Sequence, residues 1–375
     1  MRIAIVTFHR AFNCGAMLQA WALKVILERM GHMVEFPSCN HVGEIARWKV
    51  GWKKPGSRGL SLLRSVIGRS LLNLMSIPNE DISRMRYDAF RRMYLPERDC
   101  KPSDFDKYYD LIIVGSDQVW NEKISEADAP LFFGENLPQR ISRIAYAVSC
   151  GDKPVEGEMI KRIGCAMKHF SAISAREKLT KDQLSALVNE EIEETLDPTL
   201  LLEAIDYEEI AQGVIPRKPY LFMYTLSTNK FFVDVARGLS RRLGVRCIIA
   251  PCYQYSRFLA PCGLTYGISP GRLVQYARNA KYVIAASFHG TAMGVIFNKP
   301  FLSLRGQVDE FESRPAALLR KLGCSERLVD PTIQLDEMLY RLLSPLPDIR
   351  NQIRLLRNDS LRWLDDKIRL LGKNR

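Results

Sequence analysis

Apolar runs of four or five residues alternate with helical patterns of apolar and polar positions along this chain of 375 residues. The run Ile3–Val6 predicts a buried strand, and the apolar spacing over residues 17–30 predicts a helix that ends at Gly31. Met33–Phe36 is the next predicted strand. A strand, a helix and a second strand in this order are typical of a parallel sheet with helices on both faces.

The same alternation continues to Ala175–Lys178, which we expect to open a helix, and begins again at Tyr220. Residues 179–219 between them are first acidic and then carry prolines, which predicts a linker. Apolar residues at spacings of three and four from Asp348 to Leu371 predict a long closing helix. The further predicted elements are the strands Leu111–Val114, Ile144–Val148, Ala172–Ser174, Tyr220–Tyr224, Cys247–Ala250, Tyr282–Ala286 and Phe301–Leu304, and the helices Phe231–Leu243, Pro270–Arg278 and Thr291–Phe297.

These elements predict an α/β fold built from two similar halves and a closing helix. We expect a first Rossmann-like domain over residues 1–205, a second over residues 206–345 and a C-terminal helix over residues 346–375. Two doubly wound domains that face each other place the ligand site in the crevice between them.

The net charge of +12, from 54 Lys and Arg against 42 Asp and Glu, points to anionic partners. Half of it lies in residues 41–75, which also carry Trp48, Trp52 and an amphipathic pattern over Leu60–Met75. Two interpretations of this inserted segment remain open: a solvated helical hairpin that closes over the cleft, and a surface that lies on an anionic membrane. Because the charge is local and no nucleic-acid-binding motif occurs, we expect no nucleic-acid partner.

Nine scattered cysteines without a CxxC pair indicate reduced thiols rather than zinc ligands or a disulfide framework. The N-terminal apolar run is too short for a signal peptide, and no apolar stretch is long enough to span a membrane. The sequence therefore predicts a cytoplasmic protein, with peripheral attachment to the inner membrane face through residues 41–75 as an open alternative. No GxGxxG, Walker A, HExxH or GxSxG motif occurs, and Asp104-Phe-Asp106 precedes a strand, so no metal or cofactor is expected.

Small polar clusters follow the carboxyl ends of several predicted strands. Because these ends meet at one edge of a parallel sheet and face the crevice, we expect the clusters to line a ligand site. The clusters are Asn13-Cys-Gly15, Gly115-Ser-Asp117, Ser149-Cys-Gly151, Arg176 and Ser287-Phe-His-Gly-Thr291.

The last cluster carries the most chemical information. An apolar strand brings Ser287 and His289 to its tip, and Gly290 frees the backbone before a helix that we expect to begin at Thr291. A helix N-terminus presents unpaired N–H groups that suit a phosphate or a carboxylate. A histidine at this place can bind an anion or transfer a proton.

Six motifs resemble, in order and spacing, those of the polysaccharide pyruvyl transferase family, and they extend over nearly the whole chain apart from residues 41–75. The motifs are Asn13-x-Gly-Ala16, Val114-Gly-Ser-Asp-Gln-Val-Trp120, Ile173-Ser-x-Arg-Glu-Lys178, Leu196-Asp-Pro-Thr-Leu200, Ser287-Phe-His-Gly-Thr291 and Asn298-Lys-Pro-Phe301. The resemblance implies a two-domain fold like that of GT-B glycosyltransferases. It also implies transfer of the pyruvate unit of phosphoenolpyruvate, a co-substrate, onto a sugar or lipid-linked glycan of a cell-surface or exopolysaccharide precursor. A pyruvate ketal would form and phosphate would leave.

The resemblance implies His289 as the general acid or as a phosphate ligand, and Asp117 as a base toward the sugar hydroxyl. Capping of a helix is the alternative role for Asp117. Where the family often has aromatic residues, this chain has Cys14 and Cys150, which concerns the shape of the acceptor site. The other residues expected to bind substrate are Asn13, Gly15, Ser116, Ser149, Arg176, Ser287, Gly290, Thr291 and Arg314.

Two arginines are the candidates for the carboxylate and the phosphate, because a guanidinium group binds such anions bidentately. Arg176 could equally form an ion pair with Glu177 or Asp197, and Arg314 could equally be a surface residue. The alternative function is a GT-B-type glycosyltransferase that uses a nucleotide sugar.

Overall fold

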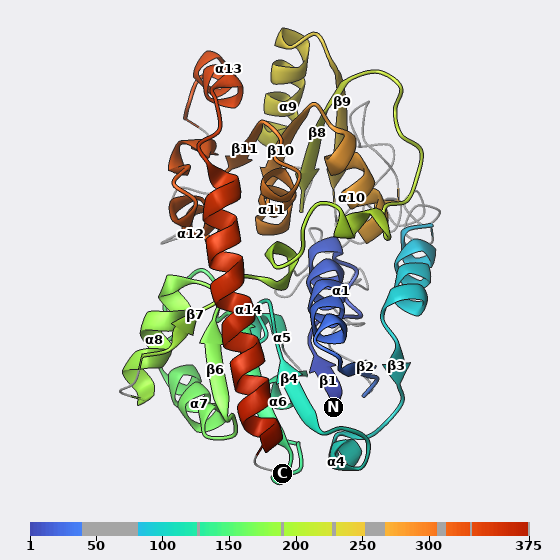
Figure 1. Cartoon of the computed structure of the whole chain (residues 1–375). Coiled ribbons are helices and arrows are strands. Elements are labelled where there is room, and N and C mark those ends of the chain that lie inside the picture. The colour runs from blue at the N-terminus through green and yellow to red at the C-terminus, as the bar shows by residue number, and fades with distance from the viewer. Residues whose placement is uncertain are drawn as a thin grey trace, which may run out of the picture.

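The computed structural model describes residues 1–39, 82–125, 128–188, 191–226, 230–251, 267–305, 313–330 and 332–373. Its N-terminal half contains a seven-stranded, all-parallel sheet of order β3-β2-β1-β4-β5-β6-β7 (Figure 1). This is a doubly wound order, which reverses direction between β1 and β4. The strands are β1 (Arg2–Val6), β2 (Met33–Pro37), β3 (Glu97–Arg98), β4 (Leu111–Val114), β5 (Ser142–Val148), β6 (Ala172–Ala175) and β7 (Glu193–Glu194).

The central strands of this sheet are apolar because helices cover both of its faces. Every residue of β4 is buried, and so is every residue of β1 after Arg2. The helices are α1 (Cys14–Arg29), a helix over residues 82–94, α4 (Phe105–Tyr108), α5 (Glu122–Ser125), α6 (Ala129–Phe132), α7 (Glu158–Met167) and α8 (Lys178–Val188).

The second sheet has five parallel strands in the order β12-β11-β10-β8-β9, and it reverses direction between β8 and β10. This too is a doubly wound order, so the predicted pair of Rossmann-like units is confirmed. The strands are β8 (Tyr220–Thr225), β9 (Arg246–Pro251), β10 (Tyr282–Ala286), β11 (Phe301–Leu304) and β12 (Leu328–Val329). The helices are α9 (Lys230–Arg242), α10 (Pro270–Asn279), α11 (Phe288–Ile296), α12 (Arg314–Lys321) and α13 (Leu335–Leu343).

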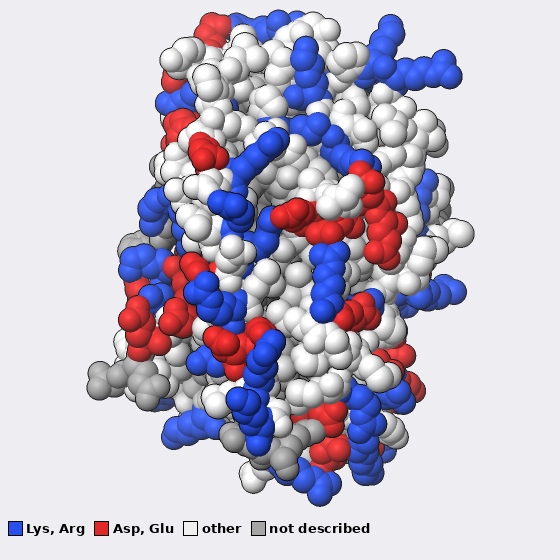
Figure 2. Space-filling model, viewed as in Figure 1, with Lys and Arg blue, Asp and Glu red and all other residues white. Residues whose placement is uncertain are grey.

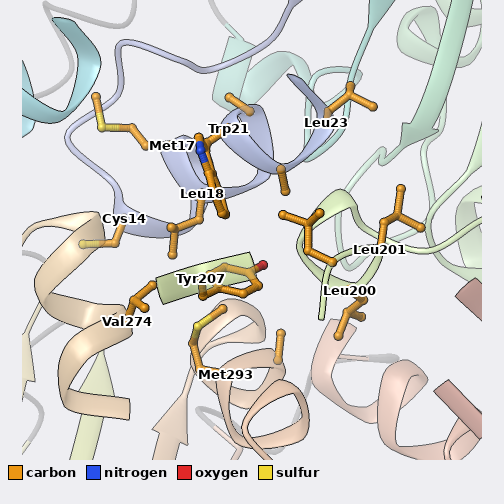
Figure 3. Close-up of a cluster of buried hydrophobic side chains, with 14 of the residues drawn as sticks. Cys14, Met17, Leu18, Trp21, Leu23, Leu200, Leu201, Tyr207, Val274 and Met293 are labelled. Carbon is orange, nitrogen blue, oxygen red and sulfur yellow. The ribbon is translucent and has the colours of Figure 1, made fainter. Parts of the chain in front are cut away.

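Apolar side chains fill the seam between the two sheets (Figure 3). Trp21 of α1 lies against Tyr207 of the linker, with ring centroids 5.2 Å apart, and Tyr207 lies 5.9 Å from Phe297. Met293 of α11 and Val274 of α10 belong to the same cluster. The two sheets therefore share one hydrophobic core, which holds them in a defined relation.

The C-terminal helix α14 (Ile349–Lys373) runs from the second sheet back over the first, as Figure 1 shows. Its Trp363 ring lies 6.0 Å from the Tyr146 ring of β5, and Arg357 donates to the backbone oxygens of Leu200 and Leu202 in the linker. The predicted closing helix is confirmed. No helix in the described ranges is long and apolar enough to cross a membrane.

Three sequence predictions about helix positions need correction. The α1 and α11 helices each begin three residues before the predicted start, because Asn13 and Ser287 act as their N-caps. The predicted linker over residues 179–219 contains most of α8 and all of β7, so the connection between the sheets begins only after Glu194. The boundaries at residues 205 and 345 stay predictions.

The charged side chains of the face in Figure 2 do not form one basic patch. Lys and Arg are spread over the whole of that face, with acidic side chains in patches among them. The basic segment over residues 41–75 lies outside the described residues, so both interpretations of it stay predictions.

Candidate functional site

The site begins at the tip of β4, where a buried polar triangle fixes the loop that carries Ser116 and Asp117. Gln19 of α1 donates to Thr7 Oγ1 at 2.7 Å and accepts from the Ser116 backbone N–H at 3.2 Å, while Thr7 donates to the Ser116 carbonyl at 3.1 Å. All three side chains are fully buried. Since each polar group in the triangle has a partner, the loop has little freedom to move.

Arg176 follows β6 directly and is held by carboxylates on several sides. Its Nη1 lies 3.2 Å from Asp117 Oδ1 and 3.1 Å from Asp197 Oδ2, and its Nε lies 3.1 Å from Glu177 Oε2. Phe288 of the second sheet's α11 covers the guanidinium, 5.0 Å from its ring centroid. Both of the ion pairs that the sequence left open for Arg176 are therefore present, with Asp117 as a further partner.

Asp197 is the buried carboxylate at the centre of this cluster. It caps the short 3₁₀ turn Pro198–Leu200 in the connection between the sheets. Its Oδ1 accepts from the backbone N–H and the hydroxyl of Thr199, at 3.0 and 2.7 Å. Its Oδ2 faces Arg176 and, at 3.6 Å, Nε2 of His289.

His289 reaches the cluster from the second sheet, in the first turn of α11. Ser287 begins this helix by accepting a hydrogen bond from the Gly290 N–H at 3.2 Å. The imidazole lies flush against the backbone of Gly15: a methyl group at Gly15 would come within 2.0 Å of Nδ1. The first turn of α1, from the first domain, thus meets the first turn of α11, from the second, at His289. This histidine is only 7% exposed.

Arg314, the first residue of α12, joins the cluster across the seam. Its Nε lies 3.0 Å from Asp152 and its Nη1 lies 3.5 Å from Asp117. Lys321, at the other end of α12, pairs with Glu194 of β7. Ion pairs with the first sheet thus hold both ends of α12, and Arg314 is a residue of the seam.

The charges of the cluster hold one another in their ionised forms. Burial alone would raise the pKa of Asp197, but His289 and Arg176 hold that pKa below its ordinary value. The pKa of Asp117 is also lowered against the effect of burial, by Arg176, His289 and Arg314. Burial would lower the pKa of Arg176, yet its carboxylate neighbours raise it. At neutral pH both carboxylates and the guanidinium are therefore charged.

Two buried side-chain nitrogens of the cluster have no partner within hydrogen-bond distance among the described residues. They are Arg176 Nη2 and His289 Nε2, and the latter faces Asp197 Oδ2 at 3.6 Å. A cavity of about 20 Å³, room for roughly one water molecule, is lined by Arg176 and by residues from both sheets, among them Glu177, Asp197, Phe288 and Arg314. Unpaired buried donors are costly, so they mark a place where an acceptor belongs.

The family model of polysaccharide pyruvyl transferases matches residues 13–307. This chain belongs to that family. The match covers every strand of the two sheets except β1 and β12, and all the residues of the cluster except Arg314. No curated protein matches the chain significantly.

Solved structures with a similar course of the chain include nucleotide-sugar enzymes. A UDP-GlcNAc 2-epimerase from Neisseria meningitidis matches with a TM-score of 0.49 and 10% identity, over 98% of this chain and 99% of that one. The spinosyn rhamnosyltransferase SpnG matches with a TM-score of 0.45 and 13% identity, over 99% and 97%. UGT89C1 from Arabidopsis thaliana matches with a TM-score of 0.46 and 11% identity, over 99% of each chain. The fold assignment rests on the two doubly wound sheets themselves.

Of the eleven residues predicted from the sequence for the site, six meet in the cluster. These are Gly15, Ser116, Asp117, Arg176, His289 and Arg314.

The other five predicted residues support the loops and helices around it. Asn13 and Ser287 are N-caps, and Ser149 Oγ accepts from the Gly151 N–H. Thr291 shares a hydrogen bond with Ser303 inside the second domain. Gly290 is an ordinary helical residue whose missing side chain leaves room for Ala285 and Tyr224, so the predicted freeing of the backbone is wrong.

The sequence-based set lacks four residues that the structure places in the cluster. Glu177 and Asp197 stand in motifs of this family, but the sequence indicates them only as ion-pair partners of Arg176. Asp152 directly follows the predicted polar cluster Ser149-Cys-Gly151, and Phe288 lies within the His289 motif. The sequence shows only that such residues lie in or beside a motif, and this position does not reveal which groups their side chains contact.

Proposed function

We propose that this chain transfers the pyruvate unit of phosphoenolpyruvate onto a sugar of a cell-surface or exopolysaccharide precursor, forming a pyruvate ketal and releasing phosphate. Family membership supports a transferase of polysaccharide synthesis. The observation that carries the finer assignment is the unpartnered buried donor Arg176 Nη2 at the cavity, with His289 Nε2, also without a hydrogen-bond partner, facing the same Asp197 oxygen. Phosphoenolpyruvate brings a carboxylate and a phosphate, and such charge-assisted acceptors suit donors of this kind.

The reaction needs one proton donor and two nucleophilic hydroxyls. A proton adds to the methylene carbon while a sugar hydroxyl oxygen bonds to the neighbouring carbon, and the bond from that carbon to the phosphate oxygen then breaks. The second hydroxyl forms the second C–O bond of the ketal. Of the two hydroxyl protons, one replaces the proton given to the methylene carbon and the other leaves with the phosphate. We assign the protonation of the methylene carbon to His289, since a positioned acid increases the rate by about 10²–10⁴-fold.

Asp117 is better suited to hold the arginines than to act as a base. Its pKa is lowered by Arg176, His289 and Arg314 although burial opposes this, and a carboxylate with a lowered pKa is a weaker proton acceptor. Its Oδ1 lies within 3.5 Å of both guanidinium groups. The roles that we propose for Arg176 and Arg314 are to neutralise the carboxylate and the phosphate of the substrate.

Substrate entry requires side chains at the seam to move. The cavity holds about one water molecule, which is too little for phosphoenolpyruvate. Arg314 is the side chain best placed to move, because it is 18% exposed while Arg176 is 2% exposed. Its ion pairs with Asp117 and Asp152 are the contacts that the substrate's own anionic groups would replace.

The test is phosphate release from phosphoenolpyruvate with candidate sugar and lipid-linked acceptors. Wild-type protein should show acceptor-dependent release, and His289→Gln should abolish it. If this variant still binds phosphoenolpyruvate, His289 is the acid; if binding is lost as well, it is a phosphate ligand. His169→Gln, at an exposed histidine, is the matched control and should keep full activity.

The proposal fails if wild-type protein neither binds phosphoenolpyruvate nor releases phosphate with any acceptor. Stabilisation against thermal unfolding by nucleoside diphosphates, but not by phosphoenolpyruvate, would instead support a glycosyltransferase that uses a nucleotide sugar.

A further inference from the structure

Asp197 occupies an unusual place for a buried charge, because it belongs to the connection between the two sheets and faces a side chain from each. The carboxylate is 1% exposed, and removing such a charge from water costs several kcal/mol unless it is paired and hydrogen-bonded. Its two oxygens have different partners. Oδ1 is satisfied within the linker by Thr199, whereas Oδ2 faces Arg176 and His289.

The backbone beside Asp197 is fixed from two directions. The Leu196 N–H donates to Ser360 Oγ of α14 at 3.0 Å, and the Leu196 carbonyl accepts from the Tyr146 hydroxyl of β5 at 3.0 Å. Ser116 Oγ, 3.5 Å from Oδ2, approaches from the tip of β4. Asp197 is therefore set in place by elements that make no contact with the cavity, as expected of a residue that positions others.

We infer that Asp197 is a positioning residue that orients Arg176 and holds a negative charge beside His289, an assignment that rests on the proposed function. Asp197 accepts a hydrogen bond from Arg176 Nη1, which leaves Arg176 Nη2 without a partner and available to the substrate. At 3.6 Å from Nε2, its negative charge faces the imidazole that the proposed reaction uses as proton donor.

The same negative charge opposes binding of an anionic substrate, and this gives the inference a distinctive signature. Removing the charge takes away support for the acid, so kcat falls. It also removes a repulsion, while Asp117 and Glu177 still hold Arg176, so affinity for phosphoenolpyruvate does not fall. A merely structural residue would lower stability and affinity together.

The variant that separates these effects is Asp197→Asn. Asparagine keeps an N-cap oxygen for Thr199, but it presents a neutral NH₂ or C=O to Arg176 and His289. We expect kcat to fall at least tenfold while KM for phosphoenolpyruvate, and Kd measured by calorimetry, stay equal or decrease. Asp197→Glu, which restores the charge on a longer stem, should recover part of kcat.

Asp206→Asn is the matched control. Asp206 lies in the same linker, accepts from the Glu203 N–H as a local cap and pairs with Arg29 at 2.7 Å, outside the cluster. Its variant should keep wild-type kcat and KM.

Asp197→Ser, a second neutral residue able to cap, replaces the asparagine variant if that one does not fold. A wild-type kcat in a folded neutral variant overturns the inference and leaves the proposed function intact. A rise in KM with unchanged kcat overturns it too, as does failure of both neutral variants to fold, since each shows a structural role. Absence of phosphoenolpyruvate binding and turnover in wild-type protein removes the proposed function and this inference with it.

Discussion

Replacing Gly15 by Ala tests whether the two domains meet at His289 as the structure has them. Gly15 lies in the first turn of α1, where Ala is favoured over Gly by up to roughly 1 kcal/mol on helix propensity alone. The new methyl group, however, would lie 2.0 Å from His289 Nδ1, whereas ordinary contact begins at 3.4 Å. The imidazole must therefore move by about 1.4 Å, the difference between these two distances.

A misplacement of about 1 Å at a reacting group can cost roughly 10²-fold in rate. We therefore expect kcat/KM for phosphate release to fall at least about 100-fold, equivalent to about 2.7 kcal/mol. Overpacking costs about 1–3 kcal/mol, and the gain in helix propensity offsets part of it. The free energy of unfolding should thus fall by no more than about 2 kcal/mol.

The assay is the phosphate-release measurement, combined with urea unfolding of each variant. Gly164→Ala is the matched control: Gly164 also lies in a helix, α7, and its added methyl group would meet only Leu187, at 3.8 Å. That variant should keep wild-type turnover and gain slightly in stability. Wild-type turnover in Gly15→Ala would refute the contact between α1 and the His289 ring.

Two further predictions concern stability, both measured by urea unfolding. Ser360→Ala leaves the buried Leu196 N–H without its acceptor and should lower the free energy of unfolding by about 1–3 kcal/mol; an unchanged midpoint would contradict the contact. In the folded state, neighbouring positive charges lower the pKa of Asp197 and that of Asp117, although burial opposes this. The two carboxylates therefore stabilise the fold above the unfolded-chain pKa of about 3.9, and this contribution is lost as pH falls below that value. Asp197→Asn should therefore lose less stability than wild type between pH 5 and pH 3, and an equal loss would contradict the lowered pKa of Asp197.

Most of the fold could be predicted because its strands are buried on both faces. Leu111–Val114 and Tyr282–Ala286 are continuous apolar runs, and the structure has them as β4 and β10 with the same bounds. Helix starts were less predictable, since the side-chain oxygens of Asn13 and Ser287 decide them and an apolar pattern does not show a cap. The α8 helix could be predicted only at its opening, Ala175–Lys178, because the residues that follow are mostly polar and its buried residues are only Thr180 and Leu184.

The candidate site was only partly predictable, because it is made where two domains dock. Strand tips brought Asp117 and Arg176 to one edge, as parallel strands require. His289 belongs to the other domain and lies 3.6 Å from Asp197 and against Gly15. This arrangement depends on how the two domains pack along the apolar seam, and no periodicity in the sequence encodes it.

The position of Asp197 ties the chemistry of the cluster to the packing of the seam. Its neighbour Leu196 is held by β5 and α14, the turn after it packs between α1 and α11, and its free oxygen faces one side chain from each domain. A change that slides one domain against the other would therefore move His289 relative to a carboxylate that stays in place. Since a charge interaction at 3.6 Å weakens with added distance and water, such a slide would weaken the support that we propose Asp197 gives to His289. The connection between the domains is thus part of the proposed catalytic apparatus.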